Sequence, residues 1–129
     1  MESEYRLLEE DGLEEADLRE LRSRIEDGMA NLITEYDVVL KNEQELIEAV
    51  VEETFRTIVE QADELDKDPE QHFYLVLKDF RESDDEQGKG TLNLILGRLK
   101  GVGHYSETVS EDVNLISGAI LKRNYEQMG

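Results

Sequence analysis

The amino-acid sequence predicts an all-α protein, a bundle of about five helices in which the first two are long. Apolar residues recur at steps of three, four and seven along most of the chain, the spacing that places them on one side of a helix. Residues that favour helix starts and helix ends separate these periodic segments. The composition of residues 73–77 also suits a strand, but the Asp-Pro pair before that segment favours a helix, and we predict no strand.

The first long helix is predicted over residues 13–40. Six residues form one stripe along it: Leu18, Leu21, Ile25, Leu32, Tyr36 and Val39. Gly28 lies where this stripe continues. A glycine weakens a helix by about 1 kcal/mol relative to alanine, but its small size also allows another helix to cross closely.

The second long helix follows Asn42, whose side chain is expected to accept a hydrogen bond at the helix start, with Glu45 reaching back to the N–H of Asn42. Its apolar stripe consists of Leu46, Ile47, Val50, Val51, Phe55, Ile58, Val59, Ala62 and Leu65. Its outer face is predicted to hold six glutamates: Glu45, Glu48, Glu52, Glu53, Glu60 and Glu64. Some of these are four residues apart and repel one another, so burial of the stripe must outweigh that repulsion.

A third helix is predicted to start at Asp68 and Pro69, because Asp caps a helix and Pro fits its first turn. It places Phe73, Val76, Leu77 and Phe80 inward. It is expected to end before residues 83–90, a polar, glycine-containing segment that we predict as a loop.

Two more helices complete the bundle. A short fourth helix is predicted from Thr91, as its cap, to Gly101, a residue typical of helix ends. The last helix is predicted to start at a capping box of Thr108 and Glu111, or with Ser110 as the cap, and to reach about Tyr125.

The length of 129 residues suits one domain. Residues 1–12 are predicted as an acidic lead-in, loose or in a short helix, and residues 13–129 as a single helical domain. The chain has no cysteine, which excludes disulfides and thiolate metal sites. The acidic N-terminal residues are unlike a signal peptide, and no stretch approaches the ~18 apolar residues of a membrane span. We therefore expect a cytoplasmic protein that does not bind a membrane.

The formal net charge is −19, from 33 acidic and 14 basic side chains. Such a surface repels nucleic-acid phosphates and anionic lipids, so direct binding of nucleic acid is not expected. Three interpretations of the acidity stay open: a solvated surface that keeps the protein soluble, adaptation to a halophilic, high-salt interior, or a surface that binds a basic partner, including mimicry of nucleic acid. The charge is uneven, because residues 1–66 carry −16 and residues 67–129 carry −3, with no acidic residue over residues 87–106.

Two segments of the second helix, Glu45–Glu48 and Glu60–Asp63, have the ExxE or ExxD pattern. In this they resemble the magnesium-binding motifs of the all-α nucleotide pyrophosphatases, and oxygen ligands suit that ion. In that family the two motifs face each other from separate helices. Here both fall on one helix, where Glu48 and Glu60 would lie roughly 18 Å apart, too far to share an ion. A solvated helix face is the alternative, and we predict no metal site and no cofactor.

A second candidate site lies in the acid-free segment. Arg98, Lys100 and His104 are close in sequence beside a glycine-bounded turn, which suggests an anion site. The alternative is that His104 packs or caps within the turn.

The sequence as a whole predicts a non-catalytic module for protein–protein interaction, with a regulatory or assembly role. It would bind a basic protein partner through helix faces and the acidic first half, at the six glutamates of the second helix. The alternative is a carboxylate-dependent magnesium or manganese hydrolase of the all-α type, assembled across a dimer. The third and fourth helices are too short to cover the first two, so we expect a leftover apolar stripe to pair with a second copy in a homodimer.

Overall fold

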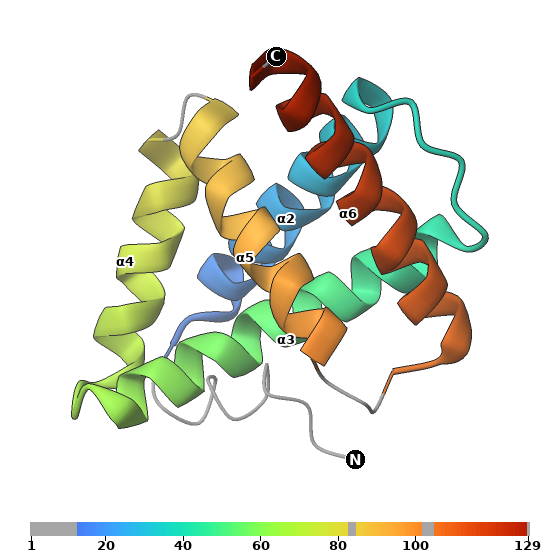
Figure 1. The fold of residues 1–129 in the computed structure, drawn as a ribbon. Coiled ribbons are helices and arrows are strands. Elements are labelled where there is room, and N and C mark those ends of the chain that lie inside the picture. Colours follow the sequence, from blue (N-terminus) through green and yellow to red (C-terminus); the bar gives the residue numbers. More distant parts are fainter. Residues whose placement is uncertain (1–12, 83–84, 102–104, 129) are drawn as a thin grey trace.

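The computed structural model describes residues 13–82, 85–101 and 105–128, and these residues form five α-helices and no strand (Figure 1). In chain order the helices are α2 (Glu15–Glu35), α3 (Glu43–Glu64), α4 (Pro69–Glu82), α5 (Asp85–Gly101) and α6 (Glu107–Met128). The prediction of an all-α bundle whose first two helices are long is confirmed. The acidic lead-in predicted over residues 1–12 lies outside the described residues. None of the described helices combines the length and the apolar composition needed to cross a membrane.

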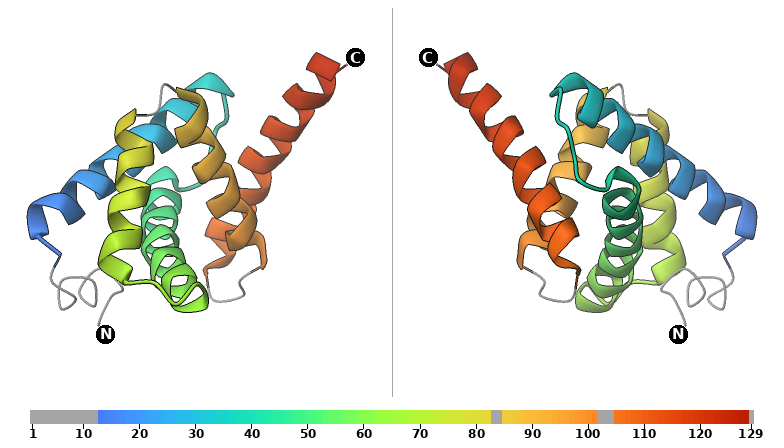
Figure 2. Two further views of the ribbon diagram at one scale, coloured as in Figure 1. Left: turned by 90° about the vertical axis from the view of Figure 1, so that its left-hand side faces the viewer. Right: turned by 90° about the vertical axis from the view of Figure 1, so that its right-hand side faces the viewer.

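Helix α3 lies at the centre of the bundle. It contacts each of the other four described helices, and Figure 2, which shows α3 nearly end-on, places it between α4 on one side and α5 and α6 on the other. Buried residues cover more than half of the circumference of α3, including Val50, Val51, Thr54 and Phe55, while Glu48 and Glu60 are exposed on its remaining side. A helix with so wide a buried face contributes to the core along most of its length. Buried residues from all five helices join in one hydrophobic cluster.

Helix α2 ends earlier than predicted, at Glu35 and not at Leu40. Asp37 adopts the left-handed conformation, with φ of 52°, and the N–H of Val38 turns back to the carbonyl of Ile33 at 3.2 Å. This closing pattern usually has glycine at the left-handed position, so the sequence gives little warning of it. Val39, predicted in the helical stripe, instead lies exposed in the connection to α3.

Helix α5 starts earlier than predicted, so the loop expected over residues 83–90 is wrong in its larger part. The helix begins at Asp85 and runs through Gly88 and Gly90, the residues that suggested a loop. Thr91 lies inside α5 and does not cap it. Helices α5 and α6 are 17 and 22 residues long, and both contact α3. Most residues of the stripes predicted on the first two helices are buried, but Val39 and Leu65 are exposed.

Of the four predicted helix caps, two are confirmed, and Thr91 is one of the two that are not. The Asn42 side chain accepts from the N–H of Glu45 at 3.1 Å, and Asp68 accepts from the N–H of Glu70 at 3.1 Å. The start of α6 was predicted at Thr108 or Ser110, which is wrong. Ser106 caps it, since its hydroxyl accepts from the N–H of Val109 at 3.2 Å.

Gly28 marks the point where α2 and α5 cross closely. A Cβ atom built on Gly28 would lie 2.8 Å from Cδ1 of Leu92, a fully buried side chain of α5. The glycine therefore allows a helix approach that an alanine would obstruct. Of the two roles considered for Gly28 from the sequence, the close crossing is the one found.

Helices α2 and α4 are joined by polar contacts at their rim. Arg81 donates two hydrogen bonds of 2.6 Å to the carboxylate of Glu20, and Tyr74 donates one of 2.7 Å to Asp17. The hydrogen bond from Arg81, followed by that from Arg24, lowers the pKa of Glu20 to about 2. The hydrogen bond to Asp17 raises the pKa of Tyr74 to about 12.

The close crossing predicts opposite effects for two glycine-to-alanine changes. Gly28→Ala gains helix propensity of about 1 kcal/mol but overpacks Leu92, at a cost of about 1–3 kcal/mol. We expect the free energy of unfolding to fall by up to about 2 kcal/mol. Gly97→Ala on α5 has no atom within 4 Å of the new Cβ and should gain about 0.5–1 kcal/mol. Urea unfolding measures both changes, and equal stabilisation of the two variants would contradict the crossing.

The lowered pKa of Glu20 predicts how its contribution depends on pH. A carboxyl whose pKa falls on folding stabilises the protein above its unfolded-state pKa, and this stabilisation disappears as the pH falls through the folded-state value. The difference in unfolding free energy between wild type and Glu20→Gln should therefore be largest above about pH 5 and vanish near pH 2. Unfolding in urea across this range measures it. The control is Glu64→Gln, which removes a carboxylate that is exposed at the end of α3.

Candidate functional site

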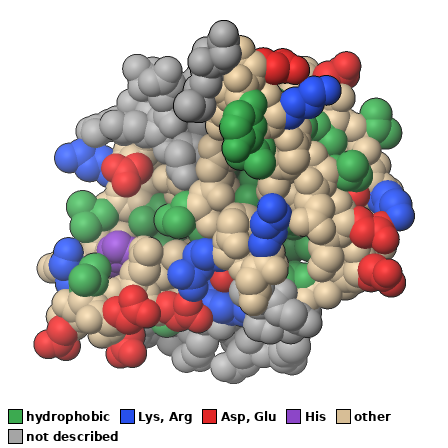
Figure 3. All heavy atoms as spheres, viewed as in Figure 1, with side chains coloured by type: hydrophobic (Ala, Val, Ile, Leu, Met, Phe, Trp, Pro, Cys, Tyr) green, Lys and Arg blue, Asp and Glu red, His purple; other side chains and the backbone are tan. Residues whose placement is uncertain are grey.

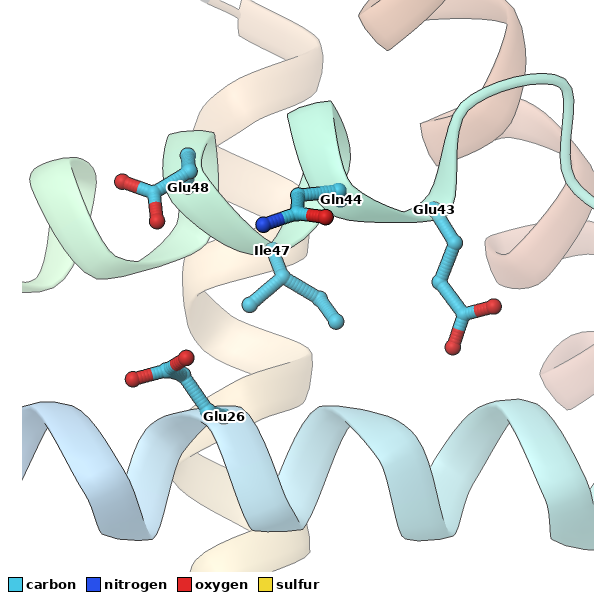
Figure 4. A pocket seen from close by; sticks show the side chains of 5 residues that line it. All are labelled: Glu26, Glu43, Gln44, Ile47 and Glu48. Atoms are coloured by element: carbon cyan, nitrogen blue, oxygen red, sulfur yellow. The ribbon is translucent and has the colours of Figure 1, made fainter.

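A surface pocket between α2 and α3 is lined by three carboxylates and has a volume of about 270 Å³ (Figure 4). We call it the acidic pocket; its lining residues are Glu26, Glu43, Gln44, Ile47 and Glu48. Figure 4 shows Ile47 pointing from α3 toward α2, while Glu26 rises from α2 toward α3. The pocket therefore combines an apolar side chain with carboxylates from two helices.

The charges around the acidic pocket are not balanced within the described residues. Arg22 pairs with both Glu48 and Glu26, the latter at 3.4 Å. Glu43 is exposed and forms no ion pair with any described residue. One guanidinium thus serves two of the three carboxylates, and the remaining charge of Glu43 faces water at the start of α3.

The six glutamates predicted to form one partner-binding face are distributed over different surroundings. Glu48 belongs to the acidic pocket, Glu52 is partly buried and Glu64 is exposed at the end of α3. Glu45 accepts a hydrogen bond of 2.7 Å from the hydroxyl of Ser106, and Glu60 pairs with Arg98. The segment that leads into α6 therefore lies against part of the face that was expected to be free.

Glu53 was predicted on the outer face of the helix, and this is wrong, because its side chain is only 1% exposed. Its carboxylate accepts a hydrogen bond of 3.0 Å from the hydroxyl of Tyr105, and it lies 3.4 Å from the guanidinium groups of both Arg56 and Arg98. Arg98 and Tyr105 come from the acid-free segment. The acid-free segment thus compensates the buried charge of Glu53 from within the same molecule. Glu53 is part of the core and is not available to a partner.

Burial changes the pKa of Tyr105 in the cluster formed by Glu53, Arg56, Arg98 and Tyr105. Removal from water, together with the nearby charge of Glu53, raises the pKa of Tyr105 above its ordinary value. The Tyr105 hydroxyl therefore stays protonated and donates to the carboxylate. Thr57, one helical turn beyond Glu53, is also buried, and its hydroxyl has no hydrogen-bond partner among the described residues.

The anion site predicted at Arg98, Lys100 and His104 is not assembled by the described residues. Arg98 is already paired with Glu53 and Glu60. Lys100 is exposed at the end of α5, and His104 lies outside the described residues. An anion would have to displace two carboxylates to bind Arg98, so the guanidinium has a structural role.

The carboxylates do not form a recognisable metal centre. No group of three or more Asp, Glu, His or Cys side chains within the described part of the chain could hold a metal ion. The two ExxE-like segments lie on α3, a single continuous helix, which agrees with the separation expected from the sequence.

Asp112 is a second buried carboxylate, and no sequence pattern indicates its role. It is fully buried, and its two oxygens accept from the N–H groups of Lys41 and Asn42 at 2.8 and 2.9 Å. The N–H of Asn42 therefore donates to Asp112 of α6 and not, as predicted, to Glu45. Asp112 follows Glu111 in an ordinary acidic helix turn, so only the folded arrangement shows which of the two faces inward.

Comparison with protein-family models, curated proteins and solved structures gives no match for this chain. We therefore infer function from the geometry and charge of the described surface. Two features are relevant: the acidic pocket, and the arginines that are already paired within the fold.

The contacts of Glu53 predict that loss of the Arg98 side chain strongly lowers the free energy of unfolding. Arg98→Ala leaves a buried carboxylate with fewer compensating partners, and we expect the free energy of unfolding to fall by about 1–3 kcal/mol. Arg19→Ala is the matched control, since Arg19 makes an exposed pair with Glu15 on one helix, and such pairs contribute less than about 1 kcal/mol. Urea unfolding compares the two variants. A loss for Arg98→Ala no greater than that for Arg19→Ala would show that the cluster does not stabilise the fold.

Proposed function

We propose that this protein is a non-catalytic interaction module that binds an arginine- or lysine-containing segment of a partner protein in the acidic pocket. The observation that supports this most directly is Glu43, an exposed carboxylate without an ion pair to any described residue. It stands beside Glu26 and Glu48, which share a single guanidinium. A cationic side chain from a partner would supply the positive charge that this pocket lacks.

The apolar part of the pocket supports the same kind of ligand. Ile47 lies between the carboxylates and is only partly buried. Arginine and lysine carry an aliphatic stem below the charged group, and that stem packs on apolar surface while the head reaches polar partners. Ile47 would contact the stem, and the carboxylates of Glu26 and Glu43 would meet the head. A small inorganic cation would make no use of Ile47.

The overall charge supports recognition of a basic partner at longer range. Ion pairs within the fold occupy Arg19, Arg22, Arg24, Arg56, Arg81, Arg98 and Arg123. The surplus of carboxylates is therefore left to act on the surroundings. A field of one sign increases the rate at which an oppositely charged partner arrives and suppresses contacts with acidic molecules. A module of this kind acts by occupying a basic segment, which suits a regulatory or assembly role.

A capped hexa-arginine peptide tests the proposal. In NMR titrations the peptide should shift the amide signals of Glu26, Glu43 and Ile47, and the affinity should fall between about 50 and 500 mM salt because the interaction is electrostatic. Glu43→Gln should weaken binding about two- to fivefold, the effect of one exposed ion pair.

The control for this experiment is Glu64→Gln, which removes one exposed charge from the opposite end of the same helix. Glu64→Gln should weaken peptide binding less than Glu43→Gln does, because it changes only the net charge of the protein. Equal weakening by the two variants, or signal shifts that avoid the pocket, would show that the peptide is attracted only by the overall charge, and the assignment of the pocket would then be wrong.

A further inference from the structure

The outer face of α6 carries an apolar stripe that nothing in the described structure covers. Leu115, Leu121 and Tyr125 are 46%, 58% and 69% exposed. Gly118 lies between them, and a Cβ atom there would meet no atom within 4 Å. Together with Lys122 these residues recur at helical spacing and fall on one face. We call this face the α6 stripe.

The fold prevents the α6 stripe from turning inward. On the opposite face of α6, Ile116 and Ile120 are buried in the core. Arg123 lies over the ring of Tyr36 at 4.4 Å and donates a hydrogen bond of 2.9 Å to the carbonyl of Glu35. Both views in Figure 2 show the C-terminal part of α6 projecting from the bundle. The helix is therefore held in position with its stripe exposed.

The α6 stripe also differs from the rest of the surface in charge. Between Leu115 and Tyr125 it contains no acidic residue and includes Lys122, in a chain of net charge −19; Glu111 lies on the same face one turn before Leu115. Figure 3 shows the side of the molecule that carries α5 and α6, where acidic side chains lie mainly toward the edges. Two copies of so acidic a protein repel each other through most faces. The apolar stretch between Leu115 and Tyr125 is a surface on which they can meet with less repulsion.

We infer that the α6 stripe binds a second copy of this chain, with the two α6 helices crossing antiparallel at Gly118 about a two-fold axis. A two-fold contact pairs the same surface on both copies, and glycine at the crossing lets the backbones approach. In this register Leu115 packs against Leu121 of the partner subunit. Lys122 of the partner subunit lies opposite Asn114, one turn from Glu111, so the positive charge of one copy meets a carboxylate of the other.

This contact differs from the homodimer expected from the sequence, which depended on uncovered stripes of the first two helices. Most residues of those stripes are buried within one chain, whereas the α6 stripe is exposed. The inference is also independent of the acidic pocket, because the two surfaces use different helices. Their responses to salt are opposite: salt screens the repulsion between two acidic copies and strengthens their association, but weakens the binding of a basic peptide.

Analytical ultracentrifugation of the full chain, over a range of concentration and salt, tests the inference. Wild type should form a dimer whose dissociation constant decreases as salt is raised. Leu121→Glu should raise that constant more than about 30-fold, as expected when a central apolar contact is lost. Leu75→Glu is the matched control, because Leu75 is a 51% exposed leucine on α4, and it should dimerise like wild type.

The possible results separate this inference from the proposed function. Circular dichroism should show that both variants remain folded, since each substituted side chain is exposed. Leu121→Glu should bind hexa-arginine as tightly as wild type, because the α6 stripe and the acidic pocket lie on different helices. If hexa-arginine does not bind wild type, the proposed function is wrong, but the dimer measurement still stands. A wild type that stays monomeric at every concentration and salt, or equal dissociation constants for Leu121→Glu and Leu75→Glu, would overturn the α6 contact.

Discussion

The buried carboxylate of Glu53 is the constraint on which the arrangement of α3, α5 and α6 depends. A charge at the centre of a helical bundle is costly unless other groups compensate it. Arg56 comes from the same helix, but Arg98 and Tyr105 come from α5 and from the segment before α6. Both can reach Glu53 only if the C-terminal end of α5 lies against the middle of α3. Compensation of this buried charge therefore determines how the acidic helix and the acid-free segment lie relative to each other.

A second buried carboxylate fixes the N-terminal end of α3. Asp112 of α6 accepts from the N–H groups of Lys41 and Asn42, just before α3 begins. Negative charge is favourable at that end of a helix, where N–H groups lack partners within the helix. Glu53 and Asp112 therefore tie α3 to α5, to Tyr105 and to α6. Apolar burial provides the driving force for packing, and these two contacts determine its register.

Periodicity predicted the helices because it depends only on local spacing, and it predicted core residues such as Leu18 and Phe55 for the same reason. It failed where the outcome depends on a distant segment. Glu52 and Glu53 are adjacent and chemically identical, yet only the position of α5 decides that Glu53 is buried. The acidic pocket is equally invisible in the sequence, because Glu26 and Glu43 belong to different helices. The end of α2 was missed because Asp37, not glycine, takes the left-handed conformation.

The surplus of negative charge is not explained by folding. The last turn of α3 contains no basic residue, and Asp63 and Glu64 lie there, at the negative end of the helix dipole. Asp66 follows in the left-handed conformation, with φ of 52°, where glycine or asparagine causes less strain. Each choice opposes folding by a few tenths of a kcal/mol to about 1 kcal/mol, although a neutral residue would fit. These carboxylates must therefore be explained by what surrounds the folded molecule, whether water, salt or a basic partner.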